Sequence, residues 1–266
     1  MKLDGCNALV TGASAGIGRE IARQLAGRAQ LIVLVARRQD RLEELRSELQ
    51  QLNPKLEVHI KAVDLADKAQ LNQLLEFPEK QGIAIDLLIN NAGLGDIGPF
   101  ATSDPQRIEE MLQVNTLALT VLTRRLLPGM LGQKNGAILN VSSSAGFMPI
   151  PKFAVYAATK AYVTSFSEAL RAELRGTGVN VCALCPGPVH TEFSQVAQRA
   201  GEQTDNGPSF IYVGVADVAR AGLNAVEQDR ALVIPGLAMK VSMAIVRLMP
   251  MALLRLLSGL SAKRTA

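Results

Sequence analysis

Short apolar runs alternate with longer amphipathic stretches along most of this chain. Each run is continuously apolar, which is typical of strands that are buried on both faces of a parallel sheet. The stretches between them carry apolar residues three or four positions apart, as at Leu42, Leu45 and Leu49, and this spacing predicts helices with one buried face. Seven runs are candidate strands: residues 8–10, 31–35, 58–63, 85–89, 137–141, 179–184 and 232–234.

Strands and helices alternate without an internal repeat or linker as far as residue 236. This order predicts an α/β fold, a single doubly wound Rossmann-type domain with a seven-stranded parallel sheet. We assign residues 1–236 to this domain and residues 237–266 to an apolar C-terminal extension that is expected to be helical. The pattern from Pro105 to about Leu127 predicts one long helix. Residues 194–208 are polar and helix-poor, which is typical of a lid over a site or of a disordered loop.

Composition narrows the function classes. The chain is 48% hydrophobic and 20% charged, which is ordinary for a soluble protein. Its net charge of +4 comes without a basic run interleaved with aromatic residues, so a nucleic-acid partner is not expected. Cys6, Cys182 and Cys185 have no metal-binding spacing, and their odd number argues against a disulfide framework. We expect core cysteines, no metal site, no secretory signal and a cytoplasmic location.

A glycine-rich turn follows the first predicted strand and opens a helical pattern; it reads Thr11-Gly-Ala-Ser-Ala-Gly-Ile-Gly18. Backbone N–H groups at a helix N-terminus favour a pyrophosphate, because the helix dipole adds partial positive charge there. Gly12 suits the tight turn, Gly16 lets a phosphate approach the backbone, and Gly18 lets the helix pack closely on the strand. The turn indicates a dinucleotide ligand.

Tyr156 and Lys160 lie four residues apart, on one face of a predicted helix. A nearby ammonium would lower the phenol pKa from its usual ~10 and make an acid–base pair, whereas a solvated Tyr–Lys pair is the alternative. Ser143 follows a strand at the carboxyl edge of the sheet, where ligands bind. Its hydroxyl could bind a carbonyl oxygen that gains charge, or it could simply cap a turn. Asn115 interrupts a helical pattern and is expected to face solvent or to hydrogen-bond locally.

Together these motifs resemble the short-chain dehydrogenase/reductase family, from about Leu3 to Pro235. The resemblance implies an oxidoreductase acting on a CH–OH group with NAD(P). The matching elements, in family order and spacing, are Thr11-Gly-x-x-x-Gly16-x-Gly18, Asn90-Asn-Ala-Gly93, Asn115, Ser143, Tyr156-x-x-x-Lys160 and Pro186-Gly187.

The resemblance also implies a role for each site residue. Tyr156 would exchange a proton with the substrate oxygen, and Lys160 would lower the pKa of Tyr156 and hold the nicotinamide ribose. Ser143 would orient the carbonyl, and Asn115 would hold a water of a proton relay. The other implied cofactor-binding residues are Gly12, Ser14, Gly16, Ile17 and Gly18 in the turn, Asp64 at the adenine, Asn91 at the adenosine ribose, Pro186, Gly187 and Val189 at the nicotinamide, and Thr191 near its carboxamide.

The end of the second strand bears on the choice of cofactor. A site for NAD(H) would place Asp or Glu there to hold the ribose hydroxyls, but this chain has Ala36 followed by Arg37 and Arg38. An arginine can clamp a 2′-phosphate that a carboxylate would repel. We therefore predict NADP(H) in preference to NAD(H). Arg37 is the expected phosphate ligand, Arg38 is expected to stack on adenine or to face solvent, and Ser14 could add a hydrogen bond.

The predicted function is an NADP(H)-dependent oxidoreductase that interconverts a ketone or aldehyde and an alcohol, with a hydrophobic or lipid-like substrate. Three alternatives remain: a non-catalytic dinucleotide-binding sensor or scaffold, an NAD-dependent alcohol dehydrogenase, and an epimerase or dehydratase on the same fold. The resemblance further implies a homo-oligomer, a dimer or a tetramer.

The apolar segment 237–260 is interrupted by Lys240, Arg247, Pro250 and Arg255, which argues against a membrane-spanning helix. Three uses remain open for this segment. It could pack beside the substrate pocket, cover a subunit interface, or make peripheral contact with a membrane through its Lys and Arg residues.

Overall fold

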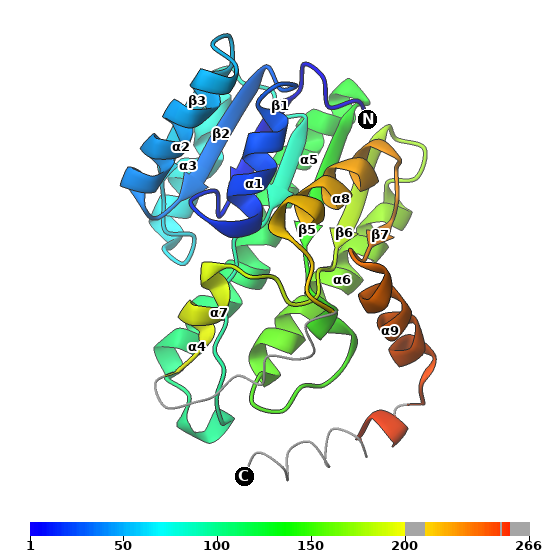
Figure 1. Ribbon diagram of the computed structural model, residues 1–266. Coiled ribbons are helices and arrows are strands. Elements are labelled where there is room, and N and C mark those ends of the chain that lie inside the picture. Colours follow the sequence, from blue (N-terminus) through cyan, green and yellow to red (C-terminus); the bar gives the residue numbers. More distant parts are fainter. Residues whose placement is uncertain (200–210, 251, 256–266) are drawn as a thin grey trace.

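The computed structural model describes residues 1–199, 211–250 and 252–255. Seven parallel strands form one sheet in the order β3-β2-β1-β4-β5-β6-β7 (Figure 1), which confirms the predicted Rossmann-type fold. The chain runs outwards from β1 to β3, and then from β4 to β7 in the other direction. The strands are β1 (Asn7–Thr11), β2 (Leu31–Ala36), β3 (Glu57–Ala62), β4 (Leu87–Asn90), β5 (Gly136–Val141), β6 (Val179–Leu184) and β7 (Leu232–Val233).

Helices cover both faces of the sheet. In Figure 1, α1 and α8 cross in front of the strands while α5 and α6 lie behind them. The α-helices are α1 (Gly16–Leu25), α2 (Gln39–Leu52), α3 (Lys68–Lys80), α4 (Pro105–Leu112), α5 (Leu119–Gln133), α6 (Ala154–Glu173), α7 (Glu192–Ala197), α8 (Val215–Glu227) and α9 (Leu237–Leu248). Within the described ranges, no helix is long and apolar enough to cross a membrane.

Alternate side chains of the central strands enter two separate cores. In β2, Ile32 and Leu34 pack with α1, α2 and α8, whereas Val33 and Val35 pack with α3, α5 and α6. Every residue of β2 is buried. A strand that is covered on both faces has no solvent side, and this explains its continuously apolar sequence. The three cysteines are free and buried, as predicted for core residues.

The long helix expected from Pro105 to Leu127 is instead divided in two. α4 ends at Leu112, a π-helical turn η2 follows over Gln113–Ala118, and α5 then continues to Gln133. The prediction missed this turn because a π-helical insertion leaves the apolar spacing almost unchanged. Such turns occur frequently at functional sites.

The segment 194–208, predicted to be helix-poor, begins inside a helix. α7 covers Glu192–Ala197, and Ile97 forms a parallel bridge with Gln198 just after it. The rest of that prediction, residues 200–208, lies outside the described residues. A helix also begins at Leu237, where the extension was expected to start; the division into a domain and an extension stays a prediction.

Leu34 lies in β2, between β3 and β1, and is fully buried. We expect Leu34→Ala to lower the free energy of unfolding by about 2–5 kcal/mol, because it removes buried contacts and leaves a cavity. Leu52→Ala is the matched control, since this leucine is 61% exposed and should change stability by no more than about 0.5 kcal/mol. Urea denaturation measures both. Equal effects of the two substitutions would contradict this account of the core.

Candidate functional site

A cavity of about 660 Å³ lies along the carboxyl ends of the strands. This edge lies where the strand order changes direction between β1 and β4, the place where doubly wound sheets bind ligands. Of the residues singled out from the sequence, those lining the cavity are Gly12, Ser14, Gly16, Ile17, Arg37, Arg38, Asp64, Asn91, Ser143, Tyr156, Lys160, Pro186, Gly187, Val189 and Thr191. Gly18 and Asn115 are absent from this lining and support it from behind.

The glycine-rich turn is shaped by its contacts with Asn91. The side-chain amide of Asn91 donates to the carbonyl oxygens of Thr11 (2.9 Å) and Gly12 (3.2 Å). Gly12 and Gly16 have φ of 66° and 55°, in the left-handed region that favours glycine. A Cβ atom on Gly12 would lie 2.7 Å from Nδ2 of Asn91, so only glycine fits there. Gly18 is similarly crowded by Gly12 and Asn91, which confirms close packing of α1 on the strand.

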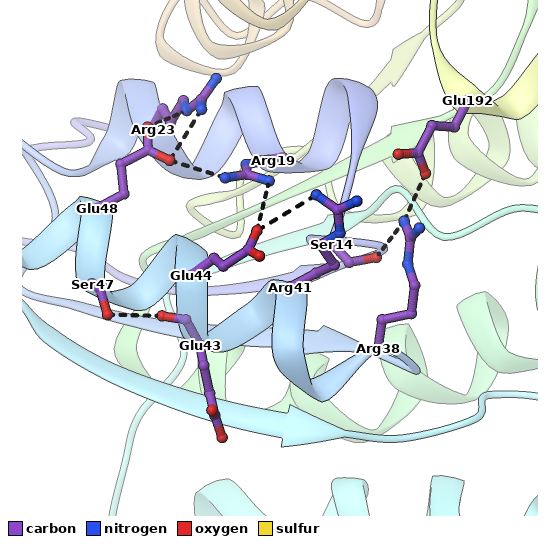
Figure 2. Close-up of polar contacts among 10 residues, drawn as sticks. All are labelled: Ser14, Arg19, Arg23, Arg38, Arg41, Glu43, Glu44, Ser47, Glu48 and Glu192. Atoms are coloured by element: carbon purple, nitrogen blue, oxygen red, sulfur yellow. Dashed lines mark hydrogen bonds and ion pairs between the residues drawn. The ribbon is translucent and has the colours of Figure 1, made fainter.

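Two arginines line the end of the cavity beside β2. Arg37 Nη1 lies 3.9 Å from Asp64 Oδ2. Arg38 is exposed to solvent, one of the two arrangements expected from the sequence, and its Nη2 donates to Ser14 Oγ (3.3 Å) and Glu192 Oε2 (2.8 Å). Figure 2 shows this bridge from the start of α2 to the glycine-rich turn and to α7. Glu192 was not predicted from the sequence, because it lies 154 residues from Arg38 in the chain.

The phenol of Tyr156 is enclosed by aromatic rings. Phe153 stacks on it with a centroid distance of 4.2 Å, and the ring of Phe193 lies at 5.3 Å. Burial raises the pKa of Tyr156 to about 12, although a hydrogen bond with Ser143 acts in the opposite direction. The lowering expected from Lys160 is therefore not found in this arrangement, because loss of water disfavours the phenolate more strongly.

Lys160 is buried below Tyr156 on α6. Its Nζ lies 5.6 Å from the centroid of the Tyr156 ring and donates to the carbonyl oxygen of Val141 at 2.8 Å. Burial lowers the pKa of Lys160 to about 8, because removal from water disfavours the charged ammonium. The backbone carbonyl of Lys160 accepts from Ser142 Oγ at 2.8 Å, which ties α6 to the end of β5. The sequence analysis did not identify Ser142.

Ser143 caps a turn, which is one of the two roles left open by the sequence, while binding of a carbonyl oxygen stays a prediction. Its Oγ accepts from the backbone N–H of Ala145 (3.1 Å) and so caps the short 3₁₀ helix η3 (Ser144–Phe147). The same hydroxyl forms the hydrogen bond with Tyr156 that affects the phenol pKa. The cap holds Ser143 at the carboxyl end of β5, and the hydroxyl is thereby directed at the phenol.

Asn115 neither faces solvent nor bonds locally, contrary to the sequence-based expectation. It lies in η2, is 1% exposed, and binds a different segment of the chain. Its Oδ1 accepts from Leu94 N (2.8 Å), and its Nδ2 donates to Leu94 O (2.9 Å) and to Thr159 Oγ1 (3.0 Å). Asn115 thus joins the loop after β4 to α6, one residue before Lys160.

The remaining wall of the cavity is formed by the segment that comes after β6 in the chain. The carbonyl of Pro186 accepts from Ser144 N at 2.9 Å, which connects this wall to the turn beside Ser143. A Cβ on Gly187 would lie 2.6 Å from Cε of Met239, so α9 packs directly behind the wall. Thr191 approaches the glycine-rich turn: a Cβ on Gly16 would lie 3.2 Å from its Cγ2. His190 stacks on Tyr212 at 4.3 Å.

The fold and this cavity define a dinucleotide-binding α/β protein with a Tyr–Lys–Ser constellation at its carboxyl edge. The family model for short chain dehydrogenase matches residues 6–202. The chain is 38% identical over 190 residues to the NADP-dependent 3-hydroxy acid dehydrogenase YdfG of Escherichia coli K12, covering 71% of this chain and 75% of that protein. This protein therefore belongs to the short-chain dehydrogenase family.

Two solved structures resemble this one over most of their length. A short-chain dehydrogenase from Sphingobium yanoikuyae in complex with NADPH has a TM-score of 0.80 and 33% identity, covering 89% of this chain and 91% of that one. The bulky-bulky ketone specific alcohol dehydrogenase from Comamonas testosteroni has a TM-score of 0.76 and 28% identity, covering 93% and 96%.

Burial of Lys160 predicts a particular dependence of stability on pH. Its pKa falls from 10.5 when exposed to about 8 in the fold. Between these values the unfolded chain binds more protons than the folded one, so the free energy of unfolding should rise with pH in that window. Lys160→Met should abolish this rise and stabilise the protein at pH 7 by up to about 3 kcal/mol.

Urea denaturation at pH 7 and pH 9.5 tests this expectation. The exposed Lys55 provides the control, since Lys55→Met should leave the pH profile of the wild type intact. A Lys160→Met protein that is less stable than the wild type at pH 7 would contradict the cost assigned to the buried ammonium.

Proposed function

We propose that this enzyme is an NADP(H)-dependent oxidoreductase that interconverts a ketone or aldehyde and the corresponding alcohol. The observation that carries the proposal is the convergence of Tyr156, Ser143 and Lys160 on the cavity that the glycine-rich turn also lines. YdfG is named as NADP-dependent and the Sphingobium enzyme is in complex with NADPH, and both support the cofactor assignment.

The residues present fit a dinucleotide that carries a 2′-phosphate. The glycine-rich turn leads directly into α1, which begins at Gly16, so the backbone N–H groups at this helix N-terminus suit a pyrophosphate. Ala36 stands where a carboxylate would be needed for NAD(H), and Arg37 and Arg38 follow it. Because Arg38 already binds Ser14 and Glu192 on either side, its guanidinium is positioned across the cavity end.

The bound nicotinamide would supply or accept a hydride at the substrate carbon. Tyr156 transfers the proton to or from the substrate oxygen, and Ser143 donates a hydrogen bond that stabilises the charge developing there. Lys160 holds the ribose and favours the transient phenolate. Asn115 holds the loop after β4 against α6 at Thr159, the residue before Lys160. In reduction, one hydride and one proton convert the carbonyl to an alcohol.

Tyr156 can act as the proton donor in a reduction. With a pKa near 12 the phenol is fully protonated at neutral pH, so it is ready to donate its proton to a carbonyl oxygen. Oxidation would require the phenolate, which burial disfavours. The preference for NADP(H), and not the pKa of Tyr156, supports reduction of a ketone or aldehyde as the proposed direction in the cell.

The walls around Tyr156 support a hydrophobic substrate. The side chains there are apolar or aromatic, and the charged residues of the described lining lie at Lys160 and along the cofactor end of the cavity. Burial of apolar substrate surface against these walls stabilises the complex, whereas a charged substrate group would lose its hydration there without gaining a partner. The apolar lining residues of this half are Leu94, Ala145, Met148, Ile150, Phe153, Phe193 and Val196.

We also propose a cytoplasmic homo-oligomer, a dimer or a tetramer, with peripheral membrane contact through its C-terminal segment. Buried free cysteines suit a reducing compartment. Exposed Leu112, Leu117 and Tyr162 on the α4–α6 side of the molecule offer apolar surface for a subunit contact.

The cofactor assignment predicts a selective loss of NADPH affinity. We expect Arg37→Ala and Arg38→Ala each to weaken NADPH binding by about 10- to 100-fold, since a hydrogen bond to a charged group contributes about 1.5–3 kcal/mol. NADH binding should change little. Fluorescence titration measures both, with Arg41→Ala as the control because Arg41 pairs with Glu44 away from the cavity. Equal binding of NADH and NADPH by the wild type would overturn the assignment.

Tyr156→Phe should lower kcat at least ~100-fold while NADPH binding stays within a few-fold, because only the proton donor is removed. Reduction of a hydrophobic aryl ketone with NADPH provides the assay. Tyr162→Phe is the matched control: this tyrosine lies on the same helix, and its hydroxyl pairs with Thr120 instead. If the wild type binds NADPH but reduces no carbonyl in a broad panel, the protein is a dinucleotide sensor.

A further inference from the structure

Positive charge is concentrated at one end of this chain. Residues 230–266 contain six Lys and Arg residues and no Asp or Glu. Residues 1–229 contain the other 22 Lys and Arg and all 24 Asp and Glu, so their formal charge is −2. The C-terminal segment therefore accounts for the whole basic excess of the protein, and a surface formed there attracts anions.

The helix α9 lies in this basic segment and has two different apolar faces. Met239 and Met243 are buried against the domain. On the opposite side, apolar residues recur at intervals of four, four and three, which places them on one exposed face. These residues are Leu237 (78% exposed), Val241 (52%), Ile245 (56%) and Leu248 (86%), and we call them the α9 face.

Two cations border the α9 face. Lys240 and Arg247 are exposed and lie seven residues apart, so they follow the same edge of the helix. An apolar helix face with Lys and Arg along its border is the arrangement by which helices lie in the interface of a bilayer, with cations reaching the lipid headgroups. The chemistry of this border matches anionic phospholipid.

The α9 face lies close to the candidate site. α9 packs against η3, which Ser143 caps, and Met239 contacts the wall at Gly187. The Arg247 guanidinium lies 5.5 Å from the Phe147 ring centroid. In Figure 1, α9 projects at the end of the molecule where α4 and α7 also lie. A surface that binds the α9 face would therefore lie next to the cavity.

A second copy of the chain fits this face less well. A symmetric contact would place the same surface of both subunits together, and so would bring two segments rich in cations into apposition without acidic residues of their own. We propose that the α9 face, with Lys240 and Arg247, docks on an anionic lipid surface. This proposal deepens the membrane contact included in the proposed function.

Sedimentation of the full-length protein with lipid vesicles tests the proposal. We expect binding to vesicles of phosphatidylcholine with added phosphatidylglycerol, and far weaker binding to phosphatidylcholine alone. Raising the salt concentration should weaken binding, because the Debye length falls from about 10 Å at 0.1 M to about 3 Å at 1 M. Lys240→Gln with Arg247→Gln should weaken binding about 30-fold, since each cation near an anionic surface contributes roughly fivefold.

Val241→Glu with Ile245→Glu should abolish vesicle binding, whereas Leu52→Glu, at an exposed leucine of α2, should not. NADPH titration checks that each variant is folded. Vesicle binding is measured without enzyme turnover, so a failure of the docking proposal can be told apart from a failure of the proposed oxidoreductase activity. Absence of binding to the anionic vesicles, or binding that survives both double substitutions, would overturn the proposal. A third outcome would also overturn it: the wild type forms a dimer, does not bind vesicles, and becomes monomeric when Val241→Glu and Ile245→Glu are introduced together.

Discussion

The hydrogen bonds between Thr11 and the segment after β4 hold the two halves of this molecule together at the point where ligands are expected. Thr11 Oγ1 donates to Ile89 O (3.2 Å) and accepts from the backbone N–H groups of Asn91 (3.0 Å) and Ala92 (3.1 Å). The side-chain amide of Asn91 in turn donates to the backbone carbonyl oxygens of Thr11 and Gly12. Because Thr11 is 1% exposed, these bonds face no competition from water. The shape of the glycine-rich turn and the position of the following loop both depend on them.

The part of the cavity around Tyr156 and Lys160 encloses two polar side chains that water would solvate better. Tyr156 and Lys160 are both buried, and burial raises the pKa of the phenol while it lowers that of the ammonium. A purely structural core would use apolar residues at both positions. The surrounding bonds from Ser142 and Asn115 keep α6 in place despite this cost. Sacrificing stability at a functional site is a common compromise in enzymes.

Much of the site was predictable because its residues occur in motifs of fixed spacing. Ser143, Tyr156 and Lys160 follow predicted strand ends or share one helix face, and parallel strands bring their carboxyl ends to one edge. Three features were not predictable in this way. The π-helical turn at Asn115, the bridge from Arg38 to Glu192, and the direction of the Tyr156 pKa shift all depend on residues that are distant in sequence.

The sequence by itself determined the sheet, the glycine-rich turn and the family, because hydrophobic period and short motifs act over a few residues. Only the tertiary structure decided what the polar side chains do. Asn115 was expected at a solvent face or in a local bond, and it joins Leu94 to Thr159 instead. The ammonium of Lys160 donates to Val141 O. Desolvation is the largest influence on the pKa of Lys160 and on the pKa of Tyr156. The energy of a polar group depends on water exclusion and on partners from other elements, and neither is encoded in local spacing.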